Sequence, residues 1–248
     1  MKGIFYPFEA SGEDIIKSDT PPGDKSKFWF NTKDYKFYFY DNATAKWYVL
    51  GQRPPLPVTL DILGDGSCDS LFQFENNLDD DGGVLTATGS DKVIYTDGVN
   101  GRGVLFDPNN NPNTFIKIKK SEPLYVSFWA YMNDITGSNQ YLLDNRGDGL
   151  GGSSYIYYGS SVQKSGVDKL VTLHGDNETD FPKQTWVFCY VEITASCNGI
   201  GLGNYTAGAS SSYSMNGVID EMRFFNRALT DDEINEVFKA EKSKFLGE

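Results

Sequence analysis

The chain has 248 residues, and its 34 acidic and 22 basic side chains give a formal net charge of −12. A charge of this sign disfavours binding to nucleic acid and to anionic membrane surfaces. No run of about 18 apolar residues occurs, so the sequence predicts no membrane-spanning helix. The 15 Tyr, 17 Phe and 26 Gly residues are typical of a sheet protein with many turns.

The N-terminal part divides into an arm, a small sheet and a linker. Residues 1–23 have little periodicity, and they fit either an extended arm that packs on a partner or a disordered terminus. Residues 27–31, 35–40 and 46–50 are short aromatic runs separated by turn residues, which predicts a three-stranded β-meander. The proline-rich segment that follows favours a semi-rigid spacer. We therefore place the domain boundary after residue 58, which gives domains 1–58 and 59–248.

The larger domain consists of short apolar runs separated by Gly, Asn and Asp. Turn signals recur every 8–15 residues, as in an antiparallel β-sandwich. The predicted strands are 70–75, 92–96, 102–107, 114–119, 123–131, 140–144, 154–158, 169–174, 185–194, 198–202 and 217–225. Residues 145–168 and 203–214 are rich in Gly and Ser and are predicted to be exposed loops, where binding specificity usually resides.

The C-terminal segment predicts a strand followed by a helix. Alternation places Val218, Asp220, Met222 and Phe224 on one strand face and Ile219, Glu221, Arg223 and Phe225 on the other. Thr230 and Glu233 have the spacing of a capping box at the start of a helix. Apolar residues at helical spacing follow, so the helix is expected to pack on the sandwich.

These segments resemble the laminin-G-like, concanavalin A-like jelly-roll family. The closing stretch 217–238 carries the resemblance most specifically, and segments 70–83, 101–107, 126–131 and 184–191 match in the order that the family has them. The resemblance implies two packed antiparallel sheets, that is, an all-β jelly-roll sandwich, and most often a binding role. The aromatic meander and the Gly-Asp-Gly-Ser-Cys stretch at 64–68 are similar to segments of tailed-phage structural proteins.

Four aromatic residues are candidate ligand-binding residues. Trp129 and Tyr131 share one face of a predicted strand, and Tyr155 and Tyr157 lie on a later one. A row of aromatic rings on an open sheet face would stack against sugar rings. The alternative is that loops cover these rings and that they form a second core.

Asp220 is the candidate metal ligand. A carboxylate on an apolar strand face must be paired, hydrogen-bonded or bound to a cation, and a Ca²⁺ ion with help from Asp79, Asp80 and Asp81 remains one option. The other option is that Asp220 accepts backbone N–H groups while residues 79–81 form a solvated loop. Among the cysteines, Cys189 is predicted to be a buried thiol, whereas Cys68 and Cys197 leave a disulfide open.

The sequence offers little for catalysis. His174 is the single histidine, and no known nucleophile, metalloprotease or phosphate-loop motif occurs. Paired acids assembled from distant loops remain the only route to a glycan-degrading enzyme. Arg146-Gly-Asp148 spells an adhesion tripeptide but is interpreted as a loop turn. We therefore expect a protein that is not an enzyme.

The resemblance and the N-terminal sequence together suggest a virion protein. Pro7 and Glu9 interrupt the first ten residues, so we expect no secretion signal and a protein made in a host cytoplasm. Residues 1–58 would attach to other virion subunits, and the jelly roll would bind a host-surface glycan or protein. A homo-oligomer is one candidate assembly. A structural decoration protein of the capsid or tail is the alternative.

Overall fold

The computed structural model describes residues 15–32, 36–42, 45–49, 58–90, 93–110, 113–121, 123–133, 139–147, 149–159, 161–175, 181–206 and 212–246. The chain divides into two compact units, Met1–Pro57 and Val58–Glu248. Within the described ranges, no helix has the length and apolar character needed to cross a membrane.

The first unit is a single four-stranded sheet. Its strands are β1 (Ile15–Ser18), β2 (Phe28–Asn31), β3 (Lys36–Asp41) and β4 (Lys46–Val49), in that order. The three predicted strands are confirmed. β1 was not predicted, and it pairs parallel to β2 within the segment expected to be an arm. The aromatic residues of the predicted arm before residue 15 lie outside the described residues.

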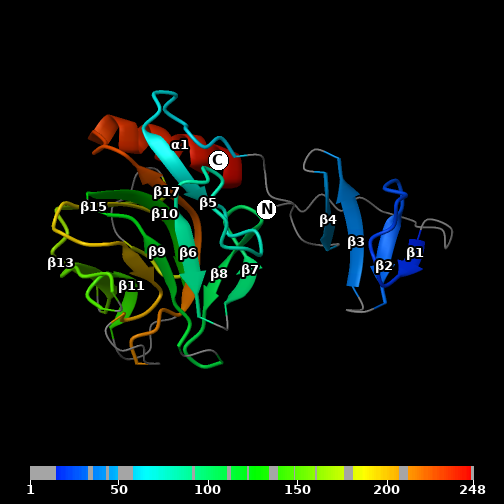
Figure 1. The fold of residues 1–248 in the computed structure, drawn as a ribbon, viewed down its shortest axis with the longest axis horizontal. Coiled ribbons are helices and arrows are strands. Elements are labelled where there is room, and N and C mark those ends of the chain that lie inside the picture. Colours follow the sequence, from blue (N-terminus) through cyan, green and yellow to red (C-terminus); the bar gives the residue numbers. More distant parts are fainter. Residues whose placement is uncertain are drawn as a thin grey trace. The chain divides into compact units, whose positions relative to one another are not determined.

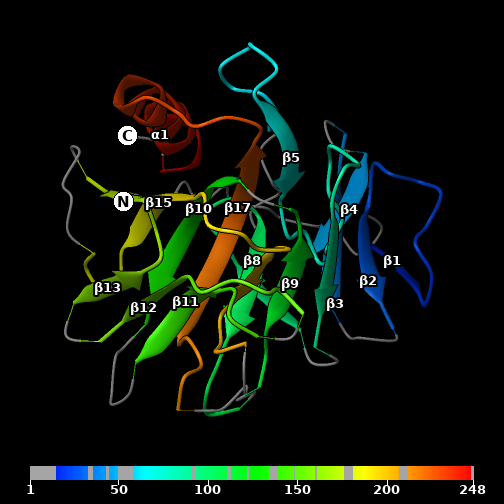
Figure 2. The same cartoon turned by 60° about the vertical axis from the view of Figure 1, so that its left-hand side comes forward.

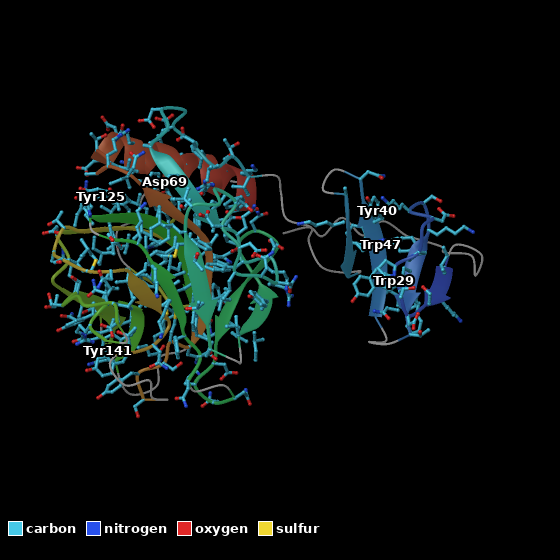
Figure 3. All side chains as sticks on the ribbon, in the orientation of Figure 1. Trp29, Tyr40, Trp47, Asp69, Tyr125 and Tyr141 are labelled. Carbon is cyan, nitrogen blue, oxygen red and sulfur yellow. The ribbon has the colours of Figure 1, made fainter. Side chains whose placement is uncertain are left out.

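Aromatic rings occupy both faces of this sheet. On one face the Trp29 ring lies 4.7 Å from Tyr38 and 5.7 Å from Trp47, between ring centroids (Figure 3). On the other face Phe30 and Phe37 are 4.8 Å apart, and 41% of Phe37 is exposed. Because the unit has no second layer among its described residues, apolar surface stays accessible.

The second unit is an all-β sandwich with one helix. Its strands are β5 (Cys68–Phe72), β6 (Thr86–Gly89), β7 (Ile94–Asp97), β8 (Arg102–Phe106), β9 (Ile116–Lys119), β10 (Leu124–Met132), β11 (Gln140–Asp144), β12 (Tyr155–Tyr158), β13 (Val162–Ser165), β14 (Lys169–Leu173), β15 (Trp186–Ile193), β16 (Ile200–Leu202) and β17 (Gly217–Phe225), and the helix is α1 (Asp231–Leu246). All eleven predicted strands are present. β6 and β13 were missed, because both are short and mostly exposed and so lack an apolar pattern.

Two antiparallel sheets form the layers of the sandwich (Figures 1 and 2). Sheet B has the order β14-β15-β10-β17-β8-β7, with β5 also paired to β17, and sheet C has the order β13-β12-β11-β16-β9-β6. Alternate side chains of both sheets meet in one core, which includes Phe106, Phe128, Leu143, Ile156 and Phe224. The prediction of a two-sheet sandwich is therefore confirmed.

Helix α1 covers the outer face of sheet B (Figure 1). Its apolar stripe is buried against the sheet, and the Phe238 ring lies 5.9 Å from Trp129 and 5.8 Å from Phe188. Glu241 accepts hydrogen bonds from Trp129 Nε1 at 2.7 Å and from Arg223 Nε at 2.6 Å. The helix therefore adds a third layer over the part of sheet B that contains Trp129 and Phe188.

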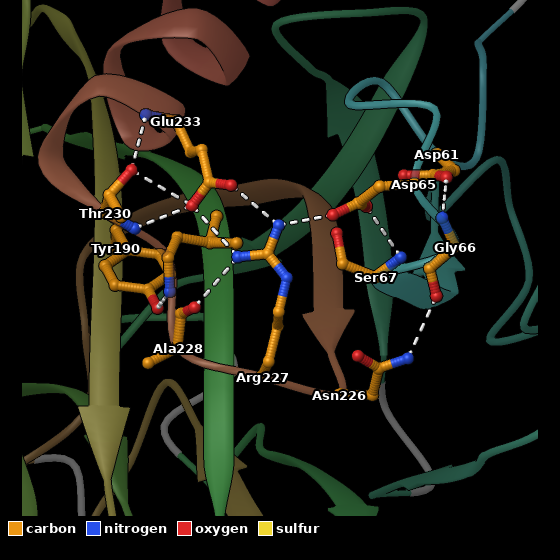
Figure 4. Close-up of polar contacts among 11 residues, drawn as sticks. Asp61, Asp65, Gly66, Ser67, Tyr190, Asn226, Arg227, Ala228, Thr230 and Glu233 are labelled. Carbon is orange, nitrogen blue, oxygen red and sulfur yellow. Dashed lines mark hydrogen bonds and ion pairs between the residues drawn. The ribbon is translucent and has the colours of Figure 1, made fainter.

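The predicted capping box fixes the start of the helix. Glu233 N donates to Thr230 Oγ1 at 3.3 Å, and Thr230 N donates to the Glu233 carboxylate at 2.8 Å (Figure 4). Arg227 binds the same carboxylate at 2.7 Å and also pairs with Asp65, which ties the helix start to the entry of the domain. Arg227 thereby holds the pKa of Glu233 below its usual value, at about 2.

A β-bulge interrupts the last strand. Ile219 pairs with Ala130 and Asp220 with Trp129, but Ser127 pairs with Arg223, so β17 contains one extra residue at this point. Glu221 has a positive φ of 48°. The regular alternation predicted for 218–225 is therefore wrong: Ile219, Met222 and Phe224 belong to the core, while Asp220 shares the face of Trp129.

Asp80 organises the loop that follows β5. Its two carboxylate oxygens accept the backbone N–H groups of four residues, Leu71, Gly82, Val84 and Leu85, at 2.8–2.9 Å. Partial burial raises the pKa of Asp80, but the four hydrogen bonds outweigh burial and lower it. The alternative that 79–81 is merely a solvated loop is thus wrong for Asp80.

Replacing Asp80 with alanine is expected to lower the free energy of unfolding by about 2 kcal/mol, because four backbone donors lose a charged acceptor. Urea unfolding of the variant measures this loss. Asp79→Ala is the matched control, since Asp79 is exposed in the same loop. Equal effects of the two substitutions would contradict the role of Asp80.

The three cysteines are free, buried thiols. The open possibility of a Cys68–Cys197 disulfide is thereby excluded, and the prediction of a buried Cys189 is confirmed. Burial raises the pKa of the Cys68 thiol to about 11 and that of Cys189 further still. Neither Cys68 nor Cys189 is therefore an activated nucleophile.

Candidate functional site

Five tyrosines gather on the outer face of sheet C. They are Tyr141 on β11, Tyr155 and Tyr157 on β12, and Tyr205 and Tyr213 from the segments between β16 and β17. We call them the tyrosine cluster. Tyr141 lies at its centre, with ring centroids 5.4–5.9 Å from those of the other four. Figure 3 shows Tyr141 at the end of the sandwich away from helix α1.

The alternation of β12, together with an irregularity in β11 between Tyr141 and Leu143, explains why these rings face outward. Tyr141 pairs with Tyr157, and Asp144 pairs with Tyr155, across the antiparallel β11–β12 ladder. The intervening Ile156 points into the core. The Tyr155 and Tyr157 rings are consequently stacked, 5.9 Å apart at an interplanar angle of 24°.

Arg146 lies among the tyrosine rings. Its guanidinium carbon is 3.9 Å from the centroid of Tyr155, 4.7 Å from that of Tyr205 and 5.0 Å from that of Tyr141. These distances are within the range of cation–π attraction. Arg146 therefore holds rings from three separate segments together.

Asp144 anchors this arginine and the neighbouring loop. The buried carboxylate accepts Arg146 Nε at 2.7 Å, and its other oxygen accepts Thr206 N at 2.6 Å and Thr206 Oγ1 at 2.8 Å. Burial by itself lowers the pKa of Arg146, but its hydrogen bonds to Asp144 and Tyr141 outweigh burial and raise it. The Arg146 guanidinium therefore stays charged, and the Asp144 carboxylate balances that charge locally.

The rings of the cluster differ in exposure. Tyr141 is nearly buried at 8% exposed, Tyr213 is 38% exposed, and Tyr155, Tyr157 and Tyr205 are half-buried. The centre of the cluster is therefore fixed, while the surrounding rings present apolar and phenolic surface to solvent. An arrangement of this kind can stack against a flat ligand and hydrogen-bond its hydroxyl groups.

The four predicted binding residues do not form one site. Tyr155 and Tyr157 belong to the tyrosine cluster. Tyr131 lies half-buried on sheet B, the opposite side of the sandwich, where its ring is 5.4 Å from that of Trp186. The structure does not bring Tyr131 together with the other two.

The expectation that Trp129 forms an open platform is wrong. Trp129 is completely buried, because helix α1 lies over its face of sheet B and Glu241 accepts its indole N–H. Tyr158, the neighbour of Tyr157 on β12, packs against the core of the sandwich, and its ring centroid lies 5.7 Å from that of Phe181. Trp129 thus belongs to a second core with Phe188 and Phe238, which is the alternative weighed from the sequence.

Sequence reasoning missed Tyr141, Tyr205, Tyr213 and Arg146. The two predicted loop segments 145–168 and 203–214 contain four of the five cluster tyrosines, all but Tyr141, and they also contain Arg146. Arg146 had been interpreted only as part of a loop turn. The remaining signal was the tyrosine content of these segments, which does not reveal that they meet.

Asp220 and Glu221 form a second unusual site, inside sheet B. Both side chains are fully buried at the bulge, where β17 changes its partner from β8 to β5. Asp220 accepts Asn100 N at 3.0 Å and Glu221 N at 2.8 Å, and Glu221 accepts Asn100 Nδ2 at 2.8 Å. Glu221 Oε2 has no hydrogen-bond partner.

Burial, followed by repulsion from a neighbouring glutamate, governs the charge of each member of this pair. Burial and the neighbouring Glu221 raise the pKa of Asp220 well above its usual value. Burial and the charge of Glu241 raise the pKa of Glu221 to about 8. Burial therefore favours the protonated form of both carboxyl groups.

The acidic loop expected to help bind Ca²⁺ is engaged elsewhere, since Asp80 holds four backbone groups of its own loop. Across the described ranges, no three His, Cys, Asp or Glu side chains are arranged to hold a metal ion. Ca²⁺ usually takes six to eight oxygen ligands. The donors around Asp220 therefore do not fit the calcium site, and its backbone hydrogen bonds match the alternative weighed from the sequence.

No family model and no curated protein matches this sequence. Among solved structures, domain 4 of an extracellular arabinanase from Geobacillus stearothermophilus, in complex with arabinotriose, is similar at 16% identity and a TM-score of 0.44, over 69% of this chain and 98% of that one. The binding domain of Paraclostridial Mosquitocidal Protein 1 is similar at 13% identity and a TM-score of 0.49, over 70% of this chain and 52% of that one. The laminin-G-like family stays a prediction.

Proposed function

We propose that this protein is a non-enzymatic binding protein whose tyrosine cluster holds a sugar of a surface glycan. The observation that supports this is a set of partly exposed aromatic rings on the outer face of sheet C, fixed by the Arg146–Asp144 pair. Flat aromatic surface complements the apolar face of a sugar ring, and phenol groups at the rim bind its hydroxyls. A host-surface protein is the other ligand that such a face accepts.

The electrostatics favour a neutral glycan. Arg146 is the cation within the cluster, and Asp144 neutralises it at 2.7 Å. The chain as a whole carries a net charge of −12, which repels acidic polysaccharides at long range. A neutral saccharide meets no such barrier, so stacking and hydrogen bonding carry the affinity.

Replacing Tyr157 with alanine is expected to weaken glycan binding about 30-fold, because an aromatic anchor of a binding site contributes about 2 kcal/mol. Binding is measured with the full chain displayed on beads, since copies of a weak site reinforce one another. Tyr131→Ala is the matched control, because Tyr131 is half-buried on the opposite sheet.

Both variants retaining binding would contradict the placement of the site. A loss in Tyr131→Ala alone would move the site to sheet B. Absence of saturable binding by the unmodified chain to any host-surface glycan or protein would instead favour the decoration role.

The wider proposal is a phage virion protein that works in host attachment. The first unit supports an assembly role: its net charge is +1, from 8 basic and 7 acidic residues in 1–57, whereas residues 58–248 carry −13. A nearly neutral sheet with aromatic rings on both faces suits contact with other virion subunits or further copies. The acidic sandwich is then the displayed part.

Phe37→Lys tests this assembly role, because it places a charge on the exposed aromatic face of the first unit. The variant is expected to fall at least tenfold in particle incorporation, measured by immunoblotting purified virions, while the soluble chain still binds glycan. The control is Val84→Lys, an exposed apolar position of the second unit. Normal incorporation of the Phe37 variant would refute attachment through this face.

A further inference from the structure

A row of apolar side chains crosses five strands of sheet B. The register pairs Ile94 on β7 with Leu105 on β8, Leu105 with Val218 on β17, Val218 with Tyr131 on β10, and Tyr131 with Trp186 on β15. Residues that pair across a ladder share one face of the sheet. The five side chains therefore form one continuous line, which we call the sheet B stripe.

The stripe lies on the outer face of the sheet. The neighbouring residues Val104, Ile219 and Ala130 pair in the same way one position along, and all three belong to the core of the sandwich. Since successive side chains of a strand point to opposite faces, the stripe points away from that core.

Most of the stripe is accessible to solvent. Ile94 is 43% exposed, and Leu105, Tyr131 and Trp186 are half-buried, whereas Val218 in the middle is 6% exposed. The rings of Tyr131 and Trp186 contact each other at 5.4 Å between centroids. A contiguous exposed apolar surface of this kind marks a site of interaction more often than scattered single residues do.

The stripe has a different border on each side. Helix α1 occupies the adjacent row of the same face, where Phe238 packs on Trp129 and Phe188. On the other side an amide pair follows, in which Asn133 Nδ2 donates to Asn216 Oδ1 at 3.2 Å. An apolar centre with a polar rim is the usual make-up of a protein interface.

The dimensions of the stripe suit a single helix. Five strands span about 19 Å from the first to the last, a length that about 13 helical residues cover. Side chains three or four residues apart on a helix are about 5–6 Å apart, close to the spacing of the strands, whereas an extended chain repeats every ~6.7 Å. A strip about 10 Å wide has an area of roughly 200 Å², far below the about 800 Å² per partner of a stable pair of globular subunits.

The charge of the sandwich indicates the polar face of such a helix. Residues 58–248 carry a net charge of −13, so second units of two copies repel one another and a basic segment is attracted. A negative charge also lies close to the stripe, since Asp107 is two residues beyond Leu105. The hydrogen bond from Asn110 at 2.7 Å lowers the pKa of Asp107, which keeps this carboxylate ionised.

We propose that the sheet B stripe docks a basic amphipathic helix of a partner protein, at a site separate from the tyrosine cluster. The apolar face of the partner helix packs on Trp186, Tyr131 and Leu105, and its cationic face points to solvent. The docked helix lies beside α1, which packs on the same face of the sheet. One chain can then hold a glycan on sheet C and a protein on sheet B.

The probe is a synthetic peptide of about 14 residues made of Leu and Lys, with all Leu on one helical face. Titration of the full chain with the labelled peptide, followed by fluorescence anisotropy, is expected to give saturable binding with a Kd on the order of 100 µM. A peptide of the same composition, with Leu spread around the helix, carries the same charge and is expected to bind at least about tenfold more weakly.

Two variants separate the stripe from general attraction by charge. Ile94→Glu and Val84→Glu each add one negative charge at an exposed apolar position, but only Ile94 belongs to the stripe. Ile94→Glu is expected to weaken peptide binding at least about tenfold although it adds charge that attracts the peptide. Val84→Glu is expected to leave binding unchanged. Equal urea midpoints of the two variants check that both are folded.

The labelled tyrosine signals place the peptide directly. In a chain that carries 3-fluorotyrosine, the ¹⁹F signal of Tyr131 is expected to shift with the peptide and that of Tyr157 to stay in place. A chain with Tyr157→Ala is expected to bind the peptide as before, so failure of this proposal and failure of the glycan site are distinguishable.

Four results would overturn the proposal. They are no saturable binding up to about 2 mM peptide, equal affinity for the two peptides, equal binding by the Ile94 and Val84 variants, and a shift of Tyr157 without Tyr131. Dimerisation of the full chain in sedimentation, if Ile94→Glu abolished it, would assign the stripe to a second copy instead.

Discussion

Glu241→Ala is expected to lower the free energy of unfolding of the second unit by about 3–5 kcal/mol, the usual cost of leaving a buried charge without its partner. Glu241 is 1% exposed and accepts hydrogen bonds from both Arg223 and Trp129. Its removal leaves the buried Arg223 cation without its carboxylate partner and the Trp129 indole N–H without its acceptor. The measurement is urea unfolding, followed by tryptophan fluorescence.

The matched control is Glu236→Ala, which removes the same side chain from an exposed position of the same helix. It is expected to change the free energy of unfolding by less than about 0.5 kcal/mol. A similar small loss in Glu241→Ala would contradict the view that this ion pair holds the helix on the sheet.

Glu221→Gln is expected to stabilise the protein by about 3 kcal/mol at pH 9 and to change it little at pH 5. The folded-state pKa of Glu221 is raised to about 8 from an ordinary value of 4.5. Between these values the folded state binds more protons than the unfolded state, so stability falls as pH rises through this window. Glutamine cannot ionise, and its oxygen still accepts Asn100 Nδ2.

Urea unfolding at pH 5, 7 and 9 measures this pH dependence, with the exposed Glu236→Gln as control. The unmodified chain should lose stability with rising pH more steeply than Glu221→Gln. A Glu221→Gln variant that is less stable than the unmodified chain at pH 9 would contradict this prediction. So would strong stabilisation by added Ca²⁺ that Asp220→Asn abolishes, because a cation rather than a proton would then neutralise the pair.

The strands and the helix start could be read from the sequence because their signals are local. Alternating apolar residues marked β10, β15 and most of β17, and the spacing of Thr230 and Glu233 marked the helix N-terminus. The bulge at Asp220 and Glu221 could not be read, because it depends on β17 changing its partner strand. One extra residue in a strand moves every following side chain to the other face of the sheet.

The site was only half predictable for the same physical reason. Tyr155 and Tyr157 lie two residues apart on one strand, so their common face follows from the sequence. Trp129 lies in an equally regular alternation on β10. Whether its ring is open to solvent depends on helix α1, which packs over it from a distant part of the chain. Tyr205 and Arg146 reach the cluster through Asp144 and Thr206, contacts that join distant segments.

The most direct measurement of the central claim is ¹⁹F NMR of the full chain labelled with 3-fluorotyrosine, titrated with neutral oligosaccharides from the host envelope. Individual Tyr→Phe variants assign the 15 tyrosine signals. The account predicts saturable shifts for Tyr157, Tyr155 and Tyr213 and none for Tyr131. Shifts confined to tyrosines outside the cluster would contradict it.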